Sequence, residues 1–215
     1  MTGNSIVHVV DDDSDVRQSL ETLLGSVGFT VRTYQSADAF LATFRDEAPS
    51  CLITDVRMPG LSGLQLQKEM EARSIDLPVI VISGHGDIDV AVKAMRQGAL
   101  HFLSKPFKMQ EMLEEVNRAI ARHREIWQAR QKRVGFTECL QSLTPREREI
   151  AALLVDGKSS KSIALALAIS DRTVDAHRGR ILAKFGARTA LELIRMFRDA
   201  GAFRNPTWVT SPQMI

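Results

Sequence analysis

The sequence has 215 residues, enough for one large domain or two small ones. Its composition, 44% hydrophobic and 25% charged, is that of an ordinary soluble globular protein, and no apolar run approaches the roughly 20 residues that span a membrane. The first residues lack the basic segment of a secretory signal, and Cys51 and Cys139 form neither a CxxC motif nor a metal-binding spacing. We therefore expect a cytoplasmic protein with reduced thiols and no membrane partner.

The net charge of +2 conceals an asymmetry between the two halves of the chain. Residues 1–121 carry a net charge of −6, whereas residues 122–215 carry a net charge of +8. An acidic half followed by a basic half indicates two domains with different partners, and the partner of the second could be a polyanion. Charge alone does not distinguish such a domain from one with a solvated basic face.

Short apolar runs alternate with helical patterns in the first half. The runs predict strands at residues 6–10, 51–54, 78–83 and 101–104, and the alternating stretch TVRTY predicts an edge strand at 30–34. Helical periodicity appears between and after them, at residues 16–27, 37–45, 63–73, 88–97 and from 109 onward. Five strands alternating with five helices predict an α/β fold with a doubly wound, five-stranded parallel sheet.

Polar residues stand where the predicted strands end. They are Asp11 and Asp12 after the first strand, Asp55 after the third, Ser83 at the end of the fourth and Lys105 after the fifth. In a doubly wound sheet the carboxyl ends of the strands share one edge, and ligands bind there. We therefore expect these residues to form one site.

The chemistry of this group favours phosphoryl binding. The carboxylates of Asp11, Asp12 and Asp55 would repel one another unless a hard cation neutralised them, and such oxygen ligands suit Mg²⁺. Lys105 supplies a positive charge and Ser83 a hydroxyl for phosphoryl oxygens. Asp55, which a turn follows, is the best candidate for a nucleophile that forms an acyl phosphate, while Asp11 and Asp12 hold the metal.

Single residues of this region also have simpler interpretations. A lone aspartate after a strand is more often a turn residue or a helix cap, and we expect Asp13 and Asp15 at the start of the first helix, where negative charge suits the helix dipole. The stretch GHGDID contains Gly84 and Gly86 but has Asp89 where the motif GxGxxG requires its third glycine. We therefore exclude a nucleotide-binding loop.

Residues 111–134 continue a helical pattern that becomes strongly charged in RHREIWQARQKRV. This stretch predicts a helical linker, either a solvated final helix with its connector or a dimeric coiled coil. Four short helical patterns without a strand follow, the first with Thr144 as N-cap, Pro145 at N1 and Glu147 at N3. The tail NPTWVTSPQMI has no periodicity, and we expect it to be unstructured or loosely packed.

The basic half contains the pattern of a helix-turn-helix. The helix SKSIALAL is followed by a turn, AIS, with Ser170 as N-cap, and by the basic helix DRTVDAHRGRILAKF. The spacing of Val174, Ile181 and Phe185 predicts that they face the core. The residues on the other side, open to a major groove, are Asp175, Ala176, Gly179 and Arg180, and those expected to hold phosphates are Lys161, Arg172, Thr173, Arg178 and Lys184. The alternative is a basic three-helix domain that has only a packing role and does not bind nucleic acid.

The motifs VVDDD, LITDVRMPGLSG, VIVISGHGD and FLSKPF together resemble the receiver domain of two-component response regulators, a flavodoxin-like fold, from Ile6 to about Arg122. The resemblance implies that Asp55 accepts a phosphoryl group from a sensor histidine kinase. It implies that Asp12 binds Mg²⁺ (or Mn²⁺) directly, with Asp11 assisting and the Arg57 carbonyl completing the protein ligands. It also implies that the phosphorylated state is sensed by Ser83, where many members carry Thr, by Lys105 and by Phe102 as the aromatic switch.

The second half, with LTPREREI and DGKSSKSIALALAISDRTVDAHRGRILAKFGARTALELI, resembles the four-helix LuxR/FixJ-type effector domain from Leu143 to about Arg198. The resemblance implies a recognition helix over residues 172–185 and a dimer contact over residues 189–198. Two departures matter: Ser160 replaces a frequent Asn, and Asp175 and Gly179 stand where some relatives place lysines. An Asp can accept a hydrogen bond from cytosine N4 and Gly reads no base edge, so we expect affinity to rest on phosphate contacts and Arg180.

Together the two halves resemble a DNA-binding response regulator of the NarL/FixJ class. The expected parts are a receiver at residues 1–122, a helical linker at 123–141, a LuxR-type helix-turn-helix domain at 142–200 and a tail at 201–215. Phosphorylation of Asp55 would change the receiver's conformation and favour homodimers that bind double-stranded DNA and control transcription. Apart from its own Mg²⁺-dependent phosphorylation and dephosphorylation, the protein is not expected to be an enzyme.

Two alternatives use the same residues differently. An aspartyl-phosphate hydrolase would need a D-x-D motif, but Arg57 stands two residues after Asp55. The other alternative is a transcription factor whose receiver-like domain works without phosphorylation. The presence of every acceptor and clamp residue argues against it.

Overall fold

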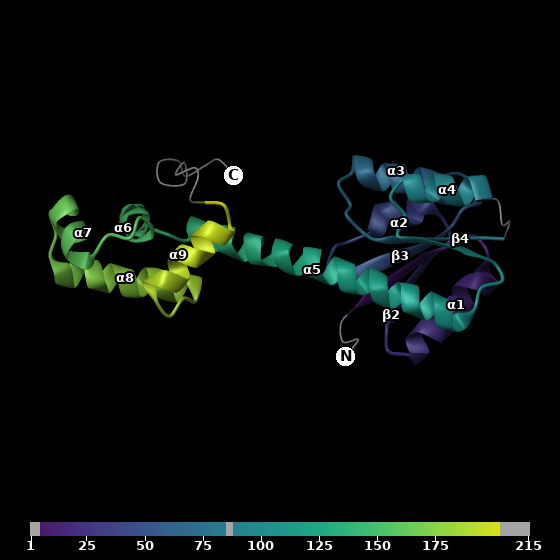
Figure 1. Cartoon of the computed structure of the whole chain (residues 1–215), viewed down its shortest axis with the longest axis horizontal. Coiled ribbons are helices and arrows are strands. Elements are labelled where there is room, and N and C mark those ends of the chain that lie inside the picture. The colour runs from purple at the N-terminus through teal and green to yellow at the C-terminus, as the bar shows by residue number, and fades with distance from the viewer. Residues whose placement is uncertain (1–4, 85–87, 203–215) are drawn as a thin grey trace. The chain divides into compact units, whose positions relative to one another are not determined.

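The computed structural model describes residues 5–84 and 88–202, and Figure 1 shows its elements. The chain divides into two compact units, of which the first extends to Gln128 and the second begins at Ala129. Gly86 and residues 203–215, the greater part of the predicted tail, lie outside the described residues. Among the helices described, none is long and apolar enough to cross a membrane.

The first unit is built on a parallel sheet, as the strand pattern predicts. Its strands are β1 (Ile6–Val10), β2 (Thr30–Tyr34), β3 (Ser50–Asp55), β4 (Val79–Ser83) and β5 (His101–Ser104). Their order is β2-β1-β3-β4-β5, and every pairing is parallel. All residues of the three central strands are buried, because helices cover both faces of the sheet.

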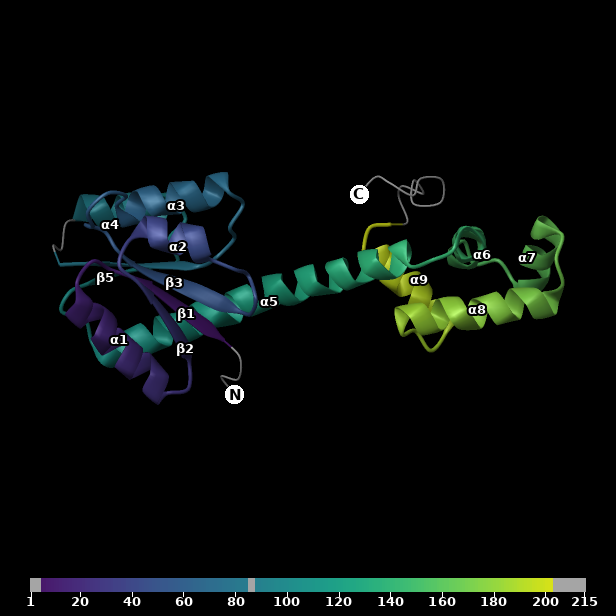
Figure 2. The same ribbon diagram turned by 180° about the vertical axis from the view of Figure 1, so that it is seen from behind.

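Helices pack on the two faces of this sheet (Figures 1 and 2). They are α1 (Ser14–Ser26), α2 (Ala37–Thr43), α3 (Gly63–Ala72), α4 (Ile88–Arg96) and α5 (Met109–Gln141). One core joins the sheet to α1 and α5 through Leu20, Leu24, Met112 and Val116. A second core joins the other face to α2, α3 and α4. The structure thus confirms the doubly wound arrangement.

Helix α5 runs from the first unit into the predicted linker. The helical pattern is clear to residue 134, and α5 ends at Gln141, the last residue of the predicted helical linker. His123, in the charged stretch, is buried and its Nδ1 accepts a hydrogen bond from the Ser50 amide over 2.8 Å. Phe136 and Leu140, both within the predicted linker, are buried in the core of the second unit. The linker sequence therefore supplies core residues as well as solvated ones.

The second unit is all-helical in the residues that the structure describes. Its helices after α5 are α6 (Pro145–Val155), α7 (Ser160–Leu167), α8 (Asp171–Phe185) and α9 (Ala190–Asp199). The core contains Ile150, Ile163, Val174, Ile181 and Phe197. The predicted caps are confirmed: Thr144 and Glu147 form a reciprocal capping box with Pro145 at N1, and the Ser170 side chain accepts the Thr173 amide.

Candidate functional site

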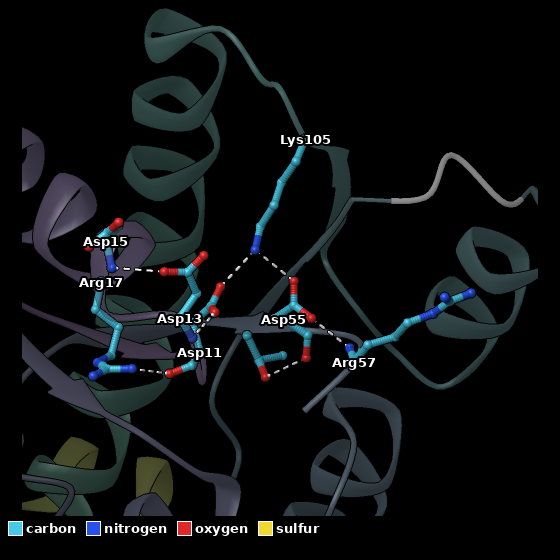
Figure 3. A network of polar contacts seen from close by, with 8 residues as sticks. Asp11, Asp13, Asp15, Arg17, Asp55, Arg57 and Lys105 are labelled. Atoms are coloured by element: carbon cyan, nitrogen blue, oxygen red, sulfur yellow. Dashed lines mark hydrogen bonds and ion pairs between the residues drawn. The ribbon is translucent and has the colours of Figure 1, made fainter. Parts of the chain in front are cut away.

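An ammonium group joins two carboxylates at the carboxyl ends of the central strands. Lys105, directly after β5, places its Nζ 2.8 Å from Asp11 Oδ2 and 2.8 Å from Asp55 Oδ1 (Figure 3). Asp11 follows β1 and is 1% exposed, and Asp55 ends β3 and is 6% exposed. The parallel register therefore brings together three side chains that are far apart in the sequence.

Backbone contacts fix the orientation of both carboxylates. Asp11 Oδ1 accepts the Asp13 amide over 2.9 Å, and the Asp11 carbonyl accepts a hydrogen bond from Arg17 Nη1 over 2.7 Å. Asp55 Oδ2 accepts the Arg57 amide over 2.6 Å (Figure 3). Each aspartate thus keeps one oxygen on the backbone and turns the other toward Lys105.

Burial and charge act against each other in this group. Burial raises the pKa of Asp11, and its hydrogen bonds from Lys105 and from the Asp13 amide offset this only in part. Burial lowers the pKa of Lys105, but hydrogen bonds to Asp11 and Asp55 outweigh it, so that this pKa is raised overall. The lysine is therefore held in its charged form between two carboxyl groups.

The three carboxylates predicted to hold a metal differ in their exposure. Asp12 is exposed, and the described residues include no group of three His, Cys, Asp or Glu side chains that could hold a metal ion. Asp13 is the N-cap of α1, and its side chain accepts the Asp15 amide. Asp13 and Asp15 therefore lie at the start of this helix, as predicted. The possible metal ligands are carboxylate oxygens of the buried Asp11 and Asp55 and of the exposed Asp12. They are hard oxygen ligands, which suit Mg²⁺ or Mn²⁺.

Ser83 and Phe102 lie on the strands beside this group. Ser83 ends β4, is buried, and pairs in register with Ser104 of β5. Its carbonyl accepts the Lys105 amide over 2.7 Å, which ties the start of the loop after β5 to the end of β4. Phe102 is half-buried and packs against the core on the α2, α3 and α4 face.

The second unit presents a basic helix at its surface. In α8 the predicted core residues Val174, Ile181 and Phe185 are buried. The exposed residues of α8 that the sequence assigns to nucleic acid are Arg172, Thr173, Asp175, Ala176, Gly179 and Arg180. Lys161 on α7 is also exposed, whereas Arg178 is half-buried. The helix pair α7 and α8, with a three-residue turn between them, has the connectivity of a helix-turn-helix.

Among the predicted nucleic-acid contacts, Thr173, Asp175 and Lys184 have side-chain partners inside the second unit. Lys184 Nζ donates to Glu147 Oε2 over 2.7 Å and to the Ser142 carbonyl over 2.6 Å. Burial raises the pKa of Glu147, but the Lys184 and Thr144 contacts outweigh it and lower this pKa overall. Asp175 Oδ1 accepts a hydrogen bond from Ser160 Oγ over 2.8 Å. Lys184 follows the buried Ile181 by three positions, so the two residues are neighbours on the surface of α8. This spacing could have predicted that Lys184 lies at the edge of the buried face.

Comparisons with known proteins agree with both units. Residues 7–117 match the family described as the response regulator receiver domain, and residues 141–197 match the bacterial regulatory proteins of the luxR family. The transcriptional regulatory protein TdiR of Thauera aromatica is 43% identical over 90% of this chain and 86% of the relative. The transcriptional regulatory protein FixJ of Rhizobium meliloti is 42% identical over 91% of this chain and 96% of the relative.

Solved structures are similar over the same length. The response regulator StyR has a TM-score of 0.78 at 39% identity, covering 91% of this chain and 99% of that one. Full-length FixJ from B. japonicum has a TM-score of 0.55 at 37% identity, covering 94% and 99%. The chain therefore belongs to the response regulators that combine a receiver domain with a LuxR-type DNA-binding domain. Within that class it is a FixJ-like transcription regulator.

Proposed function

We propose that a sensor histidine kinase phosphorylates Asp55 and that this step controls DNA binding by the second unit. The observation that carries the proposal is the Lys105 ammonium, which lies 2.8 Å from both Asp11 and Asp55. It supports a site in which a buried carboxylate faces a fixed positive charge, which is what a transferred phosphoryl group requires.

The transfer would use Asp55 as the nucleophile. A carboxylate oxygen of Asp55 attacks the phosphorus of a phosphohistidine, a P–O bond forms, the P–N bond breaks, and the electron pair stays on the imidazole nitrogen. Lys105 would neutralise one phosphoryl oxygen and the Ser83 hydroxyl would donate to another. Asp11, Asp12, the second carboxylate oxygen of Asp55 and the Arg57 carbonyl would hold Mg²⁺ or Mn²⁺, which would supply further neutralisation of the phosphoryl charge. Attack of water on the phosphorus would break its bond to the Asp55 carboxyl oxygen, release inorganic phosphate and return Asp55 to the carboxylate.

An apolar groove beside Lys105 supports a protein donor of the phosphoryl group. The groove, of about 410 Å³, lies between α1 and the start of α5. Its apolar lining includes Val16, Leu20, Leu23, Pro106 and Phe107. A helix of the kinase with an apolar face would fit there and bring its phosphohistidine to the neighbouring site.

The exposed face of α4 supports a homodimer formed on phosphorylation. Ile88, Val92 and Met95 follow helical spacing and are 77%, 43% and 46% exposed. Inward movement of Ser83 and Lys105 onto the phosphoryl group, with Phe102 following, would change the surface formed by α4 and β5. A second phosphorylated copy would then cover this apolar face, and α9 would contribute a further dimer contact.

Two helix-turn-helix units of such a dimer would bind adjacent half-sites of double-stranded DNA. Lys161, Arg172, Thr173 and Arg178 would contact phosphates, and Arg180 with the small residues Ala176 and Gly179 would face the bases. We assign Lys184 a structural role in place of the expected phosphate contact, because Glu147 and Ser142 occupy its ammonium. We keep the domain boundaries predicted from the sequence, which are a receiver at residues 1–122, a linker at 123–141, a DNA-binding domain at 142–200 and a tail at 201–215. We place the protein in the cytoplasm, where a bacterial operator lies.

Phosphorylation with acetyl phosphate and Mg²⁺ tests the central assignment. Intact-protein mass spectrometry should show one added phosphoryl group on the wild type and on Asp76→Asn, a matched change at an exposed aspartate. Asp55→Asn should show none. Label retained on Asp55→Asn would reject the assignment. Absence of label on the wild type, together with unaltered DNA binding, would favour the phosphorylation-independent transcription factor.

A further inference from the structure

One acidic side chain lies in the middle of the exposed face of α8. Asp175 is exposed, and two other residues of that face, Ala176 and Gly179, are small. A Cβ atom added at Gly179 would meet no atom within 4 Å, so the surface near Asp175 is open. Because Ala176 and Gly179 offer no side-chain hydrogen bond, Asp175 is the residue of these three that can read a base edge.

The neighbouring helix orients this carboxylate. Ser160 is the first residue of α7, and its hydroxyl donates to Asp175 Oδ1 over 2.8 Å. The bond connects the two helices of the helix-turn-helix and restricts the side-chain rotation of Asp175. It engages one carboxylate oxygen and leaves Oδ2 as an acceptor in a fixed direction.

A fixed acceptor on this face distinguishes the bases. Cytosine presents the N4 amino donor in the major groove, whereas guanine presents only acceptors and thymine an acceptor and a methyl group. Adenine places the N7 acceptor beside its amino group, which a carboxylate does not match. The same negative charge is repelled by DNA phosphates, so Asp175 adds discrimination at the expense of general affinity.

We propose that Asp175, positioned by Ser160, is a specificity-determining residue that selects cytosine at one position of each DNA half-site. The proposal rests on the proposed DNA-binding function and deepens it by naming the base that α8 reads. It also assigns Ser160 a role as a positioning residue, since its hydroxyl acts through Asp175.

Selection from a randomised double-stranded DNA library, with the full-length chain in the presence and absence of acetyl phosphate, tests the proposal. Wild type and Asp171→Asn, a matched loss of one negative charge on the same helix, should enrich one site with cytosine at the position read. Asp175→Asn should change that preference to adenine, because the Asn amide matches N6 and N7. Asp175→Ala should lose the preference at this position alone, with discrimination falling about tenfold or more. Ser160→Ala should keep cytosine but discriminate several-fold less.

The outcomes separate this proposal from the function on which it rests. An identical site enriched by wild type, Asp175→Asn and Asp175→Ala would overturn the reading role and leave DNA binding intact. Unchanged discrimination by Ser160→Ala alone would overturn the positioning role. A wild type that enriches no sequence would overturn both the reading role and the proposed function. Because Asp175 is exposed, these substitutions remove no buried packing.

Discussion

The Cα atom of Gly63 lies directly against the backbone of Asp55. A Cβ atom at position 63 would be 3.0 Å from the Asp55 carbonyl carbon and nearer still to its oxygen. That oxygen already accepts a hydrogen bond from Thr54 Oγ1, and the Gly63 amide donates to the Val56 carbonyl over 3.1 Å. The first turn of α3 therefore packs on the residue that we propose is phosphorylated, and the obstacle to a side chain is rigid backbone.

Gly63→Ala should displace Asp55 and destabilise the first unit. We expect a loss of about 1–3 kcal/mol in the free energy of unfolding, as for other overpacked sites, and slower labelling of Asp55 by acetyl phosphate. Urea unfolding and intact-protein mass spectrometry would measure the two effects. Gly25→Ala is the matched control: no atom lies within 4 Å of its added Cβ, and as a helical substitution it should stabilise by about 0.5–1 kcal/mol. Equal effects of the two substitutions would contradict the argument.

Lys105→Met should leave two buried carboxyl groups facing each other without their ammonium. We expect the free energy of unfolding to fall by about 1–3 kcal/mol at neutral pH, because a buried charged partner is lost. Added Mg²⁺ should restore stability more in this variant than in the wild type, since the cation would then neutralise the carboxylates alone. Urea unfolding with and without Mg²⁺ measures both, and Lys108→Met, at an exposed lysine, is the control. A variant as stable as the wild type without Mg²⁺ would argue against the bridging role.

His8 should make the first unit sensitive to acid. Burial, with a further contribution from Arg32, lowers its pKa from 6.5 to about 4, and the ring contacts Tyr34, Phe40 and Phe44. Because the folded pKa is depressed, the unfolded chain binds the proton first, and stability is fully present above pH 6.5 and is lost as pH falls toward 4. Between pH 8 and pH 5 this linkage amounts to about 2 kcal/mol.

His8→Phe should remove that part of the pH dependence. The phenyl ring cannot be protonated, so its free energy of unfolding should decline less than that of the wild type over the same pH range. Urea unfolding at pH 8 and pH 5 gives the fall in the free energy of unfolding for each protein. Subtracting the fall of His8→Phe from that of the wild type cancels the contributions of other titrating groups. Parallel declines would show that His8 is not the group responsible.

Lys184 and Lys161 should behave differently although both are basic residues of the helix-turn-helix. Lys184→Gln should lower the free energy of unfolding of the second unit by about 2–3 kcal/mol, because Glu147, 3% exposed, loses its cation. The salt dependence of DNA binding should be unchanged. Lys161→Gln should leave stability unaltered and reduce the slope of log K against log salt by about 1. A reduced slope of log K against log salt for Lys184→Gln would show instead that Lys184 contacts a DNA phosphate.

The main elements followed from local patterns. Apolar runs predicted β1, β3, β4 and β5 within one or two positions of their ends, and alternation predicted β2. For the three central strands the reason is that a strand buried on both faces needs an uninterrupted apolar stretch. Thr144, Pro145 and Glu147 predicted the start of α6, because a capping box is complete within four residues. The burial of Phe136 and Leu140 was not predicted, because it depends on helices further along the chain.

The sequence by itself determined that the residues after the strands lie at the carboxyl edge of the sheet and which side of α8 is buried, since the parallel direction of the strands and helical spacing decide both. Tertiary structure alone decided the pairings. Lys105 meets Asp11 across 94 positions, and Lys184 meets Glu147 across 37, whereas Asp12, next to Asp11, stays exposed. Periodicity specifies the face on which a side chain lies, but the atom it contacts depends on how separate elements pack, and one long lysine side chain can reach several acceptors.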